Sequence, residues 1–301
     1  MGKIKAVFVG TGMIGAGLAA NAMLNGYETV LYDVVPQEKM RESISHILDI
    51  LVDAGAATRA QADQALADCQ FSNNLEEAVK GAHFVQECIP ERLELKKSTY
   101  AAIQKVTGPD AVICSSTSKL FPTKLQEDAL YPQSILVGHP YNPSYLLPLI
   151  ELCGGEQTSP EAIQRAKEIY TGMGKVAVVC KKEIYGFIVN RLSWAALEAA
   201  KECVRDGVCS VEDMDKAIMF GPGMRMAVTG QLLTISLGVD GGFRAIAEKY
   251  GEEPTPWNEV YAQGVDEEIA NRDPAMGNTV DGVCKFRDHA FAELLKLHKL
   301  L

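Results

Sequence analysis

The feature that most constrains the fold is a glycine-rich hexamer, Gly10-Thr11-Gly12-Met13-Ile14-Gly15, set between an apolar run and a helical pattern. The apolar run covers residues 4–9, the helical pattern extends from Met13 to Asn25, and a second apolar run ends at Asp33. Strand, tight turn, helix and strand in this order are typical of one βαβ unit. The chain is therefore predicted to begin with a parallel sheet.

The context of the hexamer indicates a dinucleotide-binding turn. Gly10 permits the tight turn, Gly12 lets the backbone approach a pyrophosphate, and Gly15 allows the helix to pack closely on the strand. Backbone amides at the start of the helix, at Met13 and Ile14, are expected to bind the phosphates. The alternative is an ordinary glycine-rich turn between a strand and a helix.

Asp33 ends the second strand, eighteen residues beyond Gly15. A carboxylate here can accept hydrogen bonds from an adenosine ribose and would repel a 2′-phosphate, and the next seven residues contain no arginine. NAD is therefore favoured over NADP as the cofactor. Asp33 can also be explained as a cap of the helix that follows Pro36.

The rest of the chain divides into a mixed part and a helical part. Two helical patterns between residues 36 and 67 predict a helical hairpin inserted beside the sheet. Further strand-like runs separated by helical patterns extend the α/β sheet, with the direction of the last strands left open. These runs cover residues 83–89, 111–115, 134–138, 147–152 and 175–180.

Beyond Val179 every periodic segment is helical, and several end at glycine. We therefore expect a Rossmann-type, mainly parallel α/β domain over residues 1–184 and an all-α domain over residues 185–301. The last helix has an apolar stripe from Val283 to Leu297 that either packs within its own domain or forms a dimer interface. A homodimer through the helical domain is the expected assembly.

Composition excludes several function classes. The net charge of -10 disfavours nucleic acid and anionic membranes as partners. Because there is no run of 18 apolar residues and no signal-peptide pattern, a cytoplasmic location is expected. The eight cysteines include no C-x-x-C pair, so reduced thiols are expected and no metal site or disulfide framework is indicated.

"GHPYNPSYLLPLIE", residues 138–151, contains the best candidate for acid–base chemistry. Pro140 restricts His139 to an extended conformation at the end of a strand, where an open α/β sheet has its binding crevice. Glu151 follows on the next strand and could accept the Nδ1 proton of His139, leaving Nε2 free as a base. The alternatives are a structural histidine and a solvated strand-end glutamate.

Two other segments supply polar side chains. "CSSTSKL", residues 114–120, follows another strand, so its hydroxyls either face the crevice or form a turn or helix cap. Asn190 lies in "GFIVNRL", early in the first helix of the second domain. Its amide either makes a packing hydrogen bond or binds substrate.

Six motifs follow one another along the chain in this order: GTGMIG, QECIPERLELKK, SSTSKL, GHPYNP, PLIEL and GFIVNRL. With these motifs the chain resembles the 3-hydroxyacyl-CoA dehydrogenase superfamily over nearly its whole length. QECIPERLELKK and GPGMRMAVTG look most like the branch that contains L-gulonate 3-dehydrogenase, lambda-crystallin and L-carnitine dehydrogenase. The resemblance implies an NAD-dependent dehydrogenase. Its implied site has His139 as general base, Glu151 as orienting partner, Ser118 and Asn190 as hydrogen-bond donors to the reacting oxygen, and Glu91 and Lys96 near the nicotinamide.

Arg225 bears on the substrate class. A guanidinium in GPGMRMAVTG suits a free carboxylate, unless it forms an ion pair with an acid such as Glu198 or Asp215. The acidic character of the 36–67 hairpin leaves little for a CoA phosphate to bind. We therefore expect oxidation of the 3-hydroxyl of a small free hydroxy acid such as L-gulonate or L-carnitine. The alternatives are a 3-hydroxyacyl-CoA dehydrogenase and a non-catalytic, crystallin-like or NAD-sensing protein.

Overall fold

The computed structural model describes residues 3–301. The chain forms two compact units, an N-terminal unit up to Ala195 and a C-terminal unit from Ala196 to Leu301. The division falls within one long helix, α8 (Phe187–Arg205).

The N-terminal unit contains one sheet of eight strands in the order β3-β2-β1-β4-β5-β6-β7-β8. All neighbouring strands are parallel except β6 and β7, so β7 and β8 run opposite to the other six. The mainly parallel sheet is thus confirmed. The strands are β1 (Lys5–Val9), β2 (Glu28–Tyr32), β3 (Gln70–Ser72), β4 (Phe84–Glu87), β5 (Val112–Ser115), β6 (Ile135–Pro140), β7 (Leu149–Gly154) and β8 (Val176–Cys180).

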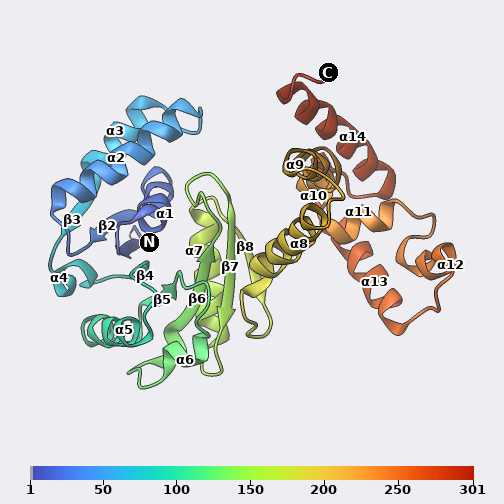
Figure 1. The fold of residues 1–301 in the computed structure, drawn as a ribbon. Coiled ribbons are helices and arrows are strands. Elements are labelled where there is room, and N and C mark those ends of the chain that lie inside the picture. The colour runs from blue at the N-terminus through green and yellow to red at the C-terminus, as the bar shows by residue number, and fades with distance from the viewer. Residues whose placement is uncertain (1–2) are drawn as a thin grey trace. The chain divides into compact units, whose positions relative to one another are not determined.

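Helices cover both faces of the sheet (Figure 1). Side chains alternate along each strand, so Phe8 joins one apolar core while Val7 and Val9 join the other. The Phe8 core includes residues of α1 (Met13–Leu24), α2 (Gln37–Asp53), α3 (Arg59–Asp68) and α7 (Pro160–Gly172). The Val7 core includes residues of α4 (Leu75–Val79), α5 (Leu93–Thr107) and α6 (Pro122–Gln126).

Helices α2 and α3 form the expected hairpin, and both contact α1. Met40, Ile44 and Leu48 recur every four residues along α2 and are buried, because this spacing places them on one face of the helix. Thr58 and Gln61 form a capping box that starts α3. Helix α2 also contacts β3, so the hairpin packs on the sheet both directly and through α1.

The C-terminal unit is helical, as expected. Its core is a cluster of apolar residues from several helices, with Leu233, Phe243, Val265 and Val283 among the buried members. The helices after α8 are α9 (Val211–Ile218), α10 (Met224–Thr229), α11 (Gln231–Leu237), α12 (Ile246–Tyr250), α13 (Pro256–Asn271) and α14 (Val280–Leu297). A π-helical turn, Met219–Gly223, joins α9 to α10.

The apolar stripe of the last helix divides between interior and surface. Val283, near the start of α14, is fully buried in the core of its own unit, whereas Leu297 at the end is 75% exposed. Packing within the unit therefore accounts for the beginning of the stripe and not for its end.

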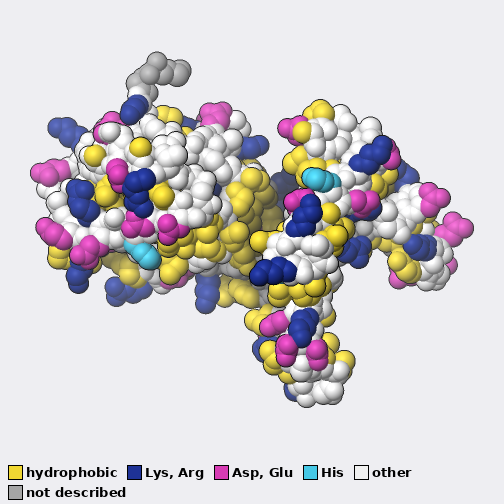
Figure 2. Space-filling model, turned by 90° about the horizontal axis from the view of Figure 1, so that it is seen from above, with side chains coloured by type: hydrophobic (Ala, Val, Ile, Leu, Met, Phe, Trp, Pro, Cys, Tyr) yellow, Lys and Arg dark blue, Asp and Glu magenta, His cyan; other side chains and the backbone are white. Residues whose placement is uncertain are grey.

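Basic and acidic side chains are intermixed over the face shown in Figure 2. Across residues 3–301, no helix combines the length and apolar character needed to cross a membrane. The same residues contain no group of three or more His, Cys, Asp or Glu side chains arranged to hold a metal ion.

Candidate active site

The glycine turn after β1 has the backbone conformation that its residues predict. Gly10 has φ +98°, and its amide donates to Tyr32 O at 2.9 Å, which joins the turn to β2. A Cβ on Gly10 would lie 2.6 Å from Cys88 O, and one on Gly15 would lie 1.9 Å from Gly10 O. Neither position tolerates a side chain, because backbone atoms fill the space.

Gly12 differs, because a Cβ there would meet nothing within 4 Å. Gly12 is the N-cap of α1, and no side chain caps that helix end. The first amides of α1, including those of Met13 and Ile14, have no intrahelical acceptor and are available to an anion. A pocket of about 690 Å³, lined by Gly10, Gly12 and Asp33 among others, lies at this end of the helix.

Asp33 borders the same pocket and organises the turn. Its Oδ2 accepts from the Thr11 amide at 2.6 Å and the Thr11 hydroxyl at 2.8 Å, and its Oδ1 accepts from the Val34 amide at 2.7 Å. The following helix, α2, has Pro36 as its N-cap and no side-chain cap. The alternative in which Asp33 caps that helix is therefore not observed.

His139 and Glu151 are direct partners across the antiparallel strands β6 and β7. His139 Nδ1 lies 2.8 Å from Glu151 Oε2, and the two residues are only 5% and 1% exposed. A carboxylate at this position makes Nδ1 the protonated nitrogen and leaves Nε2 as the acceptor. Glu151 is therefore not a solvated strand-end charge.

The other oxygen of Glu151 binds the start of α8. Oε1 accepts from the amides of Ile188 at 2.7 Å and Val189 at 2.9 Å. Phe187 precedes them with φ +52°, a conformation that non-glycine residues rarely adopt, and its ring centroid lies 5.3 Å from that of His139. Glu151 thus fixes the imidazole and the helix end together, and the helix dipole stabilises its negative charge.

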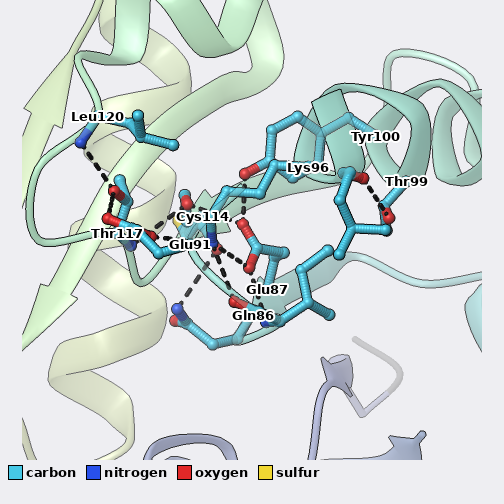
Figure 3. A network of polar contacts seen from close by, with 12 residues as sticks. Gln86, Glu87, Glu91, Lys96, Thr99, Tyr100, Cys114, Thr117 and Leu120 are labelled. Atoms are coloured by element: carbon cyan, nitrogen blue, oxygen red, sulfur yellow. Dashed lines mark hydrogen bonds and ion pairs between the residues drawn. The ribbon is translucent and has the colours of Figure 1, made fainter. Parts of the chain in front are cut away.

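Ser118 approaches His139 from the other side of the ring, with Oγ 3.1 Å from Nε2. The turn that carries Ser118 is held by Glu91, whose Oε1 accepts from the amides of Ser118 at 3.1 Å and Lys119 at 3.2 Å and from the Thr117 hydroxyl. Figure 3 shows Thr117 directed toward Glu91. Glu91 therefore positions the serine.

A buried ion pair lies behind Glu91 (Figure 3). Lys96 Nζ is 2.6 Å from Glu87 Oε1, and both side chains are at most 1% exposed. Glu87 also accepts from the hydroxyls of Tyr100 and Ser115, the latter at 2.8 Å. Lys96 Nζ lies 3.5 Å from Glu91 Oε2. The ammonium group is buried and contacts the site by way of the Glu91 carboxylate.

The two remaining predicted residues lie on other helices. Asn190 is half-buried in the first turn of α8, three residues after Phe187. Arg225, on α10 of the C-terminal unit, is exposed and lines a pocket of about 170 Å³ with Arg287. Among residues 3–301, no ion pair joins Arg225 to Glu198 or Asp215, and Glu198 pairs with Lys201 instead.

Comparison with known proteins assigns the chain to a family. Residues 5–184 match the family model of the 3-hydroxyacyl-CoA dehydrogenase NAD-binding domain, and residues 186–281 match that of the 3-hydroxyacyl-CoA dehydrogenase C-terminal domain. The chain belongs to the 3-hydroxyacyl-CoA dehydrogenase family. As a member of this family it is an NAD-dependent oxidoreductase.

Similar proteins cover almost the whole chain. An L-carnitine dehydrogenase of Pseudomonas putida is 36% identical over 97% of this chain and 92% of the relative. An L-carnitine dehydrogenase of a Pseudomonas species is 38% identical over 95% of this chain and 88% of the relative. The crystal structure of 5-formyl-3-hydroxy-2-methylpyridine 4-carboxylic acid 5-dehydrogenase, an NAD+-dependent dismutase, has a TM-score of 0.73 at 24% identity and covers 99% of both chains, which shows a shared fold.

The residues at the glycine turn fit the NAD that this family uses. The open space above Gly12, the uncapped start of α1 and the carboxylate of Asp33 give a backbone cradle for a pyrophosphate and an acceptor for ribose hydroxyls. When bound, NAD accepts a hydride from the carbon that carries the substrate hydroxyl.

Two residues of this site, Glu87 and Phe187, were missed at the level of sequence. Glu87 has a detectable signal, because it lies in the strand-like run 83–89 and a charged residue in a buried strand needs a partner. Thr117 belongs to the hydroxyls that were expected to face the crevice or form a turn, and it accepts from the Leu120 amide at 2.9 Å. Nothing in sequence shows that it also donates to Glu91. Phe187 follows Gly186, which has φ +78°, but neither its own φ of +52° nor its contact with the His139 ring can be read from the sequence.

Proposed function

We propose that this dehydrogenase oxidises the 3-hydroxyl of a small free hydroxy acid, with His139 as the general base. The observation that carries this proposal is the alignment of Ser118 Oγ, His139 Nε2, His139 Nδ1 and Glu151 Oε2 in one hydrogen-bonded series. Nε2 accepts the hydroxyl proton as the hydride departs, and Glu151 stabilises the resulting imidazolium. In the reverse direction the imidazolium returns that proton to the oxygen.

Ser118 and Asn190 are proposed to hydrogen-bond the reacting oxygen. The Ser118 hydroxyl already lies at Nε2, so a substrate hydroxyl that reaches the base also reaches Ser118. Asn190 follows the amides that bind Glu151 on the same helix turn. Two neutral donors stabilise negative charge on oxygen during proton transfer. Glu91 and Lys96 are proposed to serve the nicotinamide side of the site, Lys96 by acting through Glu91.

Arg225 is proposed to bind the substrate carboxylate. It is an exposed guanidinium with no ion-pair partner among the described residues, and a free carboxylate is its natural ligand. The relatives named L-carnitine dehydrogenase make L-carnitine the first substrate to test, with L-gulonate second.

Initial rates with NAD and four substrates test the proposal: L-carnitine, L-gulonate, 3-hydroxybutyrate and 3-hydroxybutyryl-CoA. We expect a free acid to have the highest kcat/KM. A clear preference for the thioester would reject the free-acid assignment while leaving His139 as base. His139→Asn should lower kcat by about 10²- to 10⁴-fold, whereas His46→Asn, on the exposed side of α2, serves as the matched control and should not change it.

The Arg225 assignment has its own test. Arg225→Ala should raise KM for the preferred free acid at least about tenfold, because the charge-assisted hydrogen bonds are lost, with little change in KM for NAD. Arg205→Ala, at the exposed end of α8, is the control. An unchanged substrate KM in Arg225→Ala would remove Arg225 from the substrate site.

We also propose that the enzyme is a cytoplasmic homodimer. Helix α9 has no buried residue. Val211 at its start is 63% exposed, and Met219 just beyond its end is 47% exposed. Exposed apolar side chains of this kind are typical of a protein interface. All eight cysteines are free thiols, which suits a reducing compartment. Light scattering at micromolar concentration should give twice the 32.6 kDa chain mass, and a single chain mass would reject the dimer.

A further inference from the structure

Two cysteines that the proposed reaction does not use face each other on neighbouring strands. Cys153, on β7, and Cys180, on β8, are direct partners in the parallel register. Paired residues on parallel strands project to the same face, and neighbouring strands lie roughly 4.8 Å apart. That separation is within the Cα range in which a disulfide closes without backbone rearrangement.

The two thiols have different surroundings. Cys153 is fully buried, with Sγ 3.8 Å from Gly154 O and 3.9 Å from Lys182 O. Cys180 is 7% exposed and ends its strand beside the exposed Lys181. The neighbouring Cys153 thiol, and to a smaller extent the Ile188 amide at the start of α8, lower the pKa of Cys180. The same contact with Cys180, and burial, raise the pKa of Cys153.

We propose that Cys153 and Cys180 form a peroxide-sensitive dithiol that closes to a disulfide and switches off the dehydrogenase. The assignment depends on the pairing of the two thiols across β7 and β8 and on the position of Cys153 two residues after Glu151 on β7. The thiolate is the nucleophilic form of cysteine, and of the two thiols it is Cys180 whose pKa is lowered. Cys180 is therefore the attacking thiol and Cys153 the resolving thiol.

The chemistry balances with hydrogen peroxide as the only oxidant. The Cys180 thiolate attacks one peroxide oxygen, the O–O bond breaks, and after proton uptake Cys180 is a sulfenic acid and one water is released. Cys153 then forms the S–S bond with the Cys180 sulfur, its thiol proton leaves with the displaced hydroxyl, and a second water is released. Two thiols are oxidised and one peroxide is reduced.

The disulfide would act on the proposed base through Glu151. Cys153 follows Glu151 by two residues on β7, so both side chains lie on the same face of the strand. The Ile188 amide donates to Glu151 at 2.7 Å and also lowers the pKa of Cys180, so moving the Cys180 sulfur toward Cys153 changes the surroundings of that amide. We expect the start of α8 to shift and the hydrogen bond that orients His139 to weaken.

Purified, fully reduced enzyme treated with hydrogen peroxide tests the proposal. We expect loss of two hydrogens in the intact mass, a cross-linked peptide containing Cys153 and Cys180, and at least about tenfold lower kcat, all reversed by dithiothreitol. The mass and peptide measurements need no substrate, so they stand even if the substrate assignment fails. Absence of the cross-linked peptide in the wild-type chain would overturn the proposal.

Variants separate this pair from the other thiols. Cys180→Ala should lose both the cross-link and the reversible inhibition. Cys153→Ser keeps a donor beside Cys180 but cannot form the disulfide, so it should stop at a Cys180 sulfenic acid that dimedone labels. Cys114→Ala is the matched control, since burial raises the pKa of Cys114 to about 12 and makes it unreactive. The same reversible inhibition in wild type and Cys180→Ala would assign the effect to another cysteine and overturn the switch.

Discussion

Glu91 Oε1 accepts a hydrogen bond from the Ser118 amide at 3.1 Å, and the Ser118 hydroxyl lies 3.1 Å from Nε2 of His139. The glutamate comes from the segment after β4 and the serine from the segment after β5, which are neighbouring parallel strands. The position of the serine hydroxyl at the base therefore depends on a carboxylate 27 residues earlier in the chain.

Changing Glu91 to glutamine tests this dependence. The side-chain oxygen of the new glutamine can still accept from the 117–119 turn. Its NH2 group, however, cannot replace the carboxylate oxygen that lies beside the Lys96 ammonium, so the turn should shift. We expect kcat to fall by roughly 10- to 100-fold with a smaller change in substrate KM. Glu94→Gln, exposed in the first turn of α5, is the control. Equal kcat values for the two variants would contradict the positioning role.

Lys96→Met should strongly destabilise the N-terminal unit, because it leaves the fully buried Glu87 without its cation. We expect a loss of about 3–5 kcal/mol in the free energy of unfolding, measured by urea denaturation. Lys97→Met, which removes a pair with the exposed Asp128, is the control and should change the free energy of unfolding far less, because solvent screens this pair. Adding Glu87→Gln to Lys96→Met should recover part of the loss, and no recovery would argue against an uncompensated charge as the cause.

Asp33→Ala should weaken the preference for NAD. The variant loses the carboxylate that borders the pocket and anchors Thr11, while Arg92 in the same pocket remains to attract a 2′-phosphate. We expect KM for NAD to rise roughly tenfold or more and the NADP-to-NAD ratio of kcat/KM to increase. Asp53→Ala, at the exposed end of α2, is the control. An unchanged ratio would show that another group selects the cofactor.

Lys175 should make stability depend on pH. Its Nζ donates to Ser144 O and, at 3.2 Å, to Leu147 O, and burial lowers its pKa from 10.5 to about 8. Between these two pH values Lys175 is protonated in the unfolded chain and neutral in the folded chain. The free energy of unfolding of the wild type should therefore rise with pH through this window, relative to that of Lys175→Met. Urea denaturation at intervals from pH 7 to pH 10 measures the difference, with Lys181→Met as the exposed control. If the difference in free energy of unfolding between wild type and Lys175→Met does not change with pH, the pKa of Lys175 is not lowered in the folded protein.

The local patterns of the chain determined much of this structure. The glycine hexamer, the alternation of apolar runs with helical periods and the change to helices after residue 179 predicted a Rossmann-type sheet, an inserted hairpin and a helical second part. These features are readable because turn chemistry and side-chain periodicity act over a few residues. Pro140, likewise, predicted the extended backbone of His139 from its immediate neighbour.

The partners of each buried charge were decided only by the tertiary structure. Glu151 could equally have been a solvated strand end, and pairing of β6 with β7 placed it against His139 and the amides of α8. Glu87 and Lys96 likewise became an ion pair only when β4 and α5 packed together. A sequence specifies which side chains carry charge, but desolvation leaves a buried charge stable only beside a partner, and which residues meet depends on strand order and register.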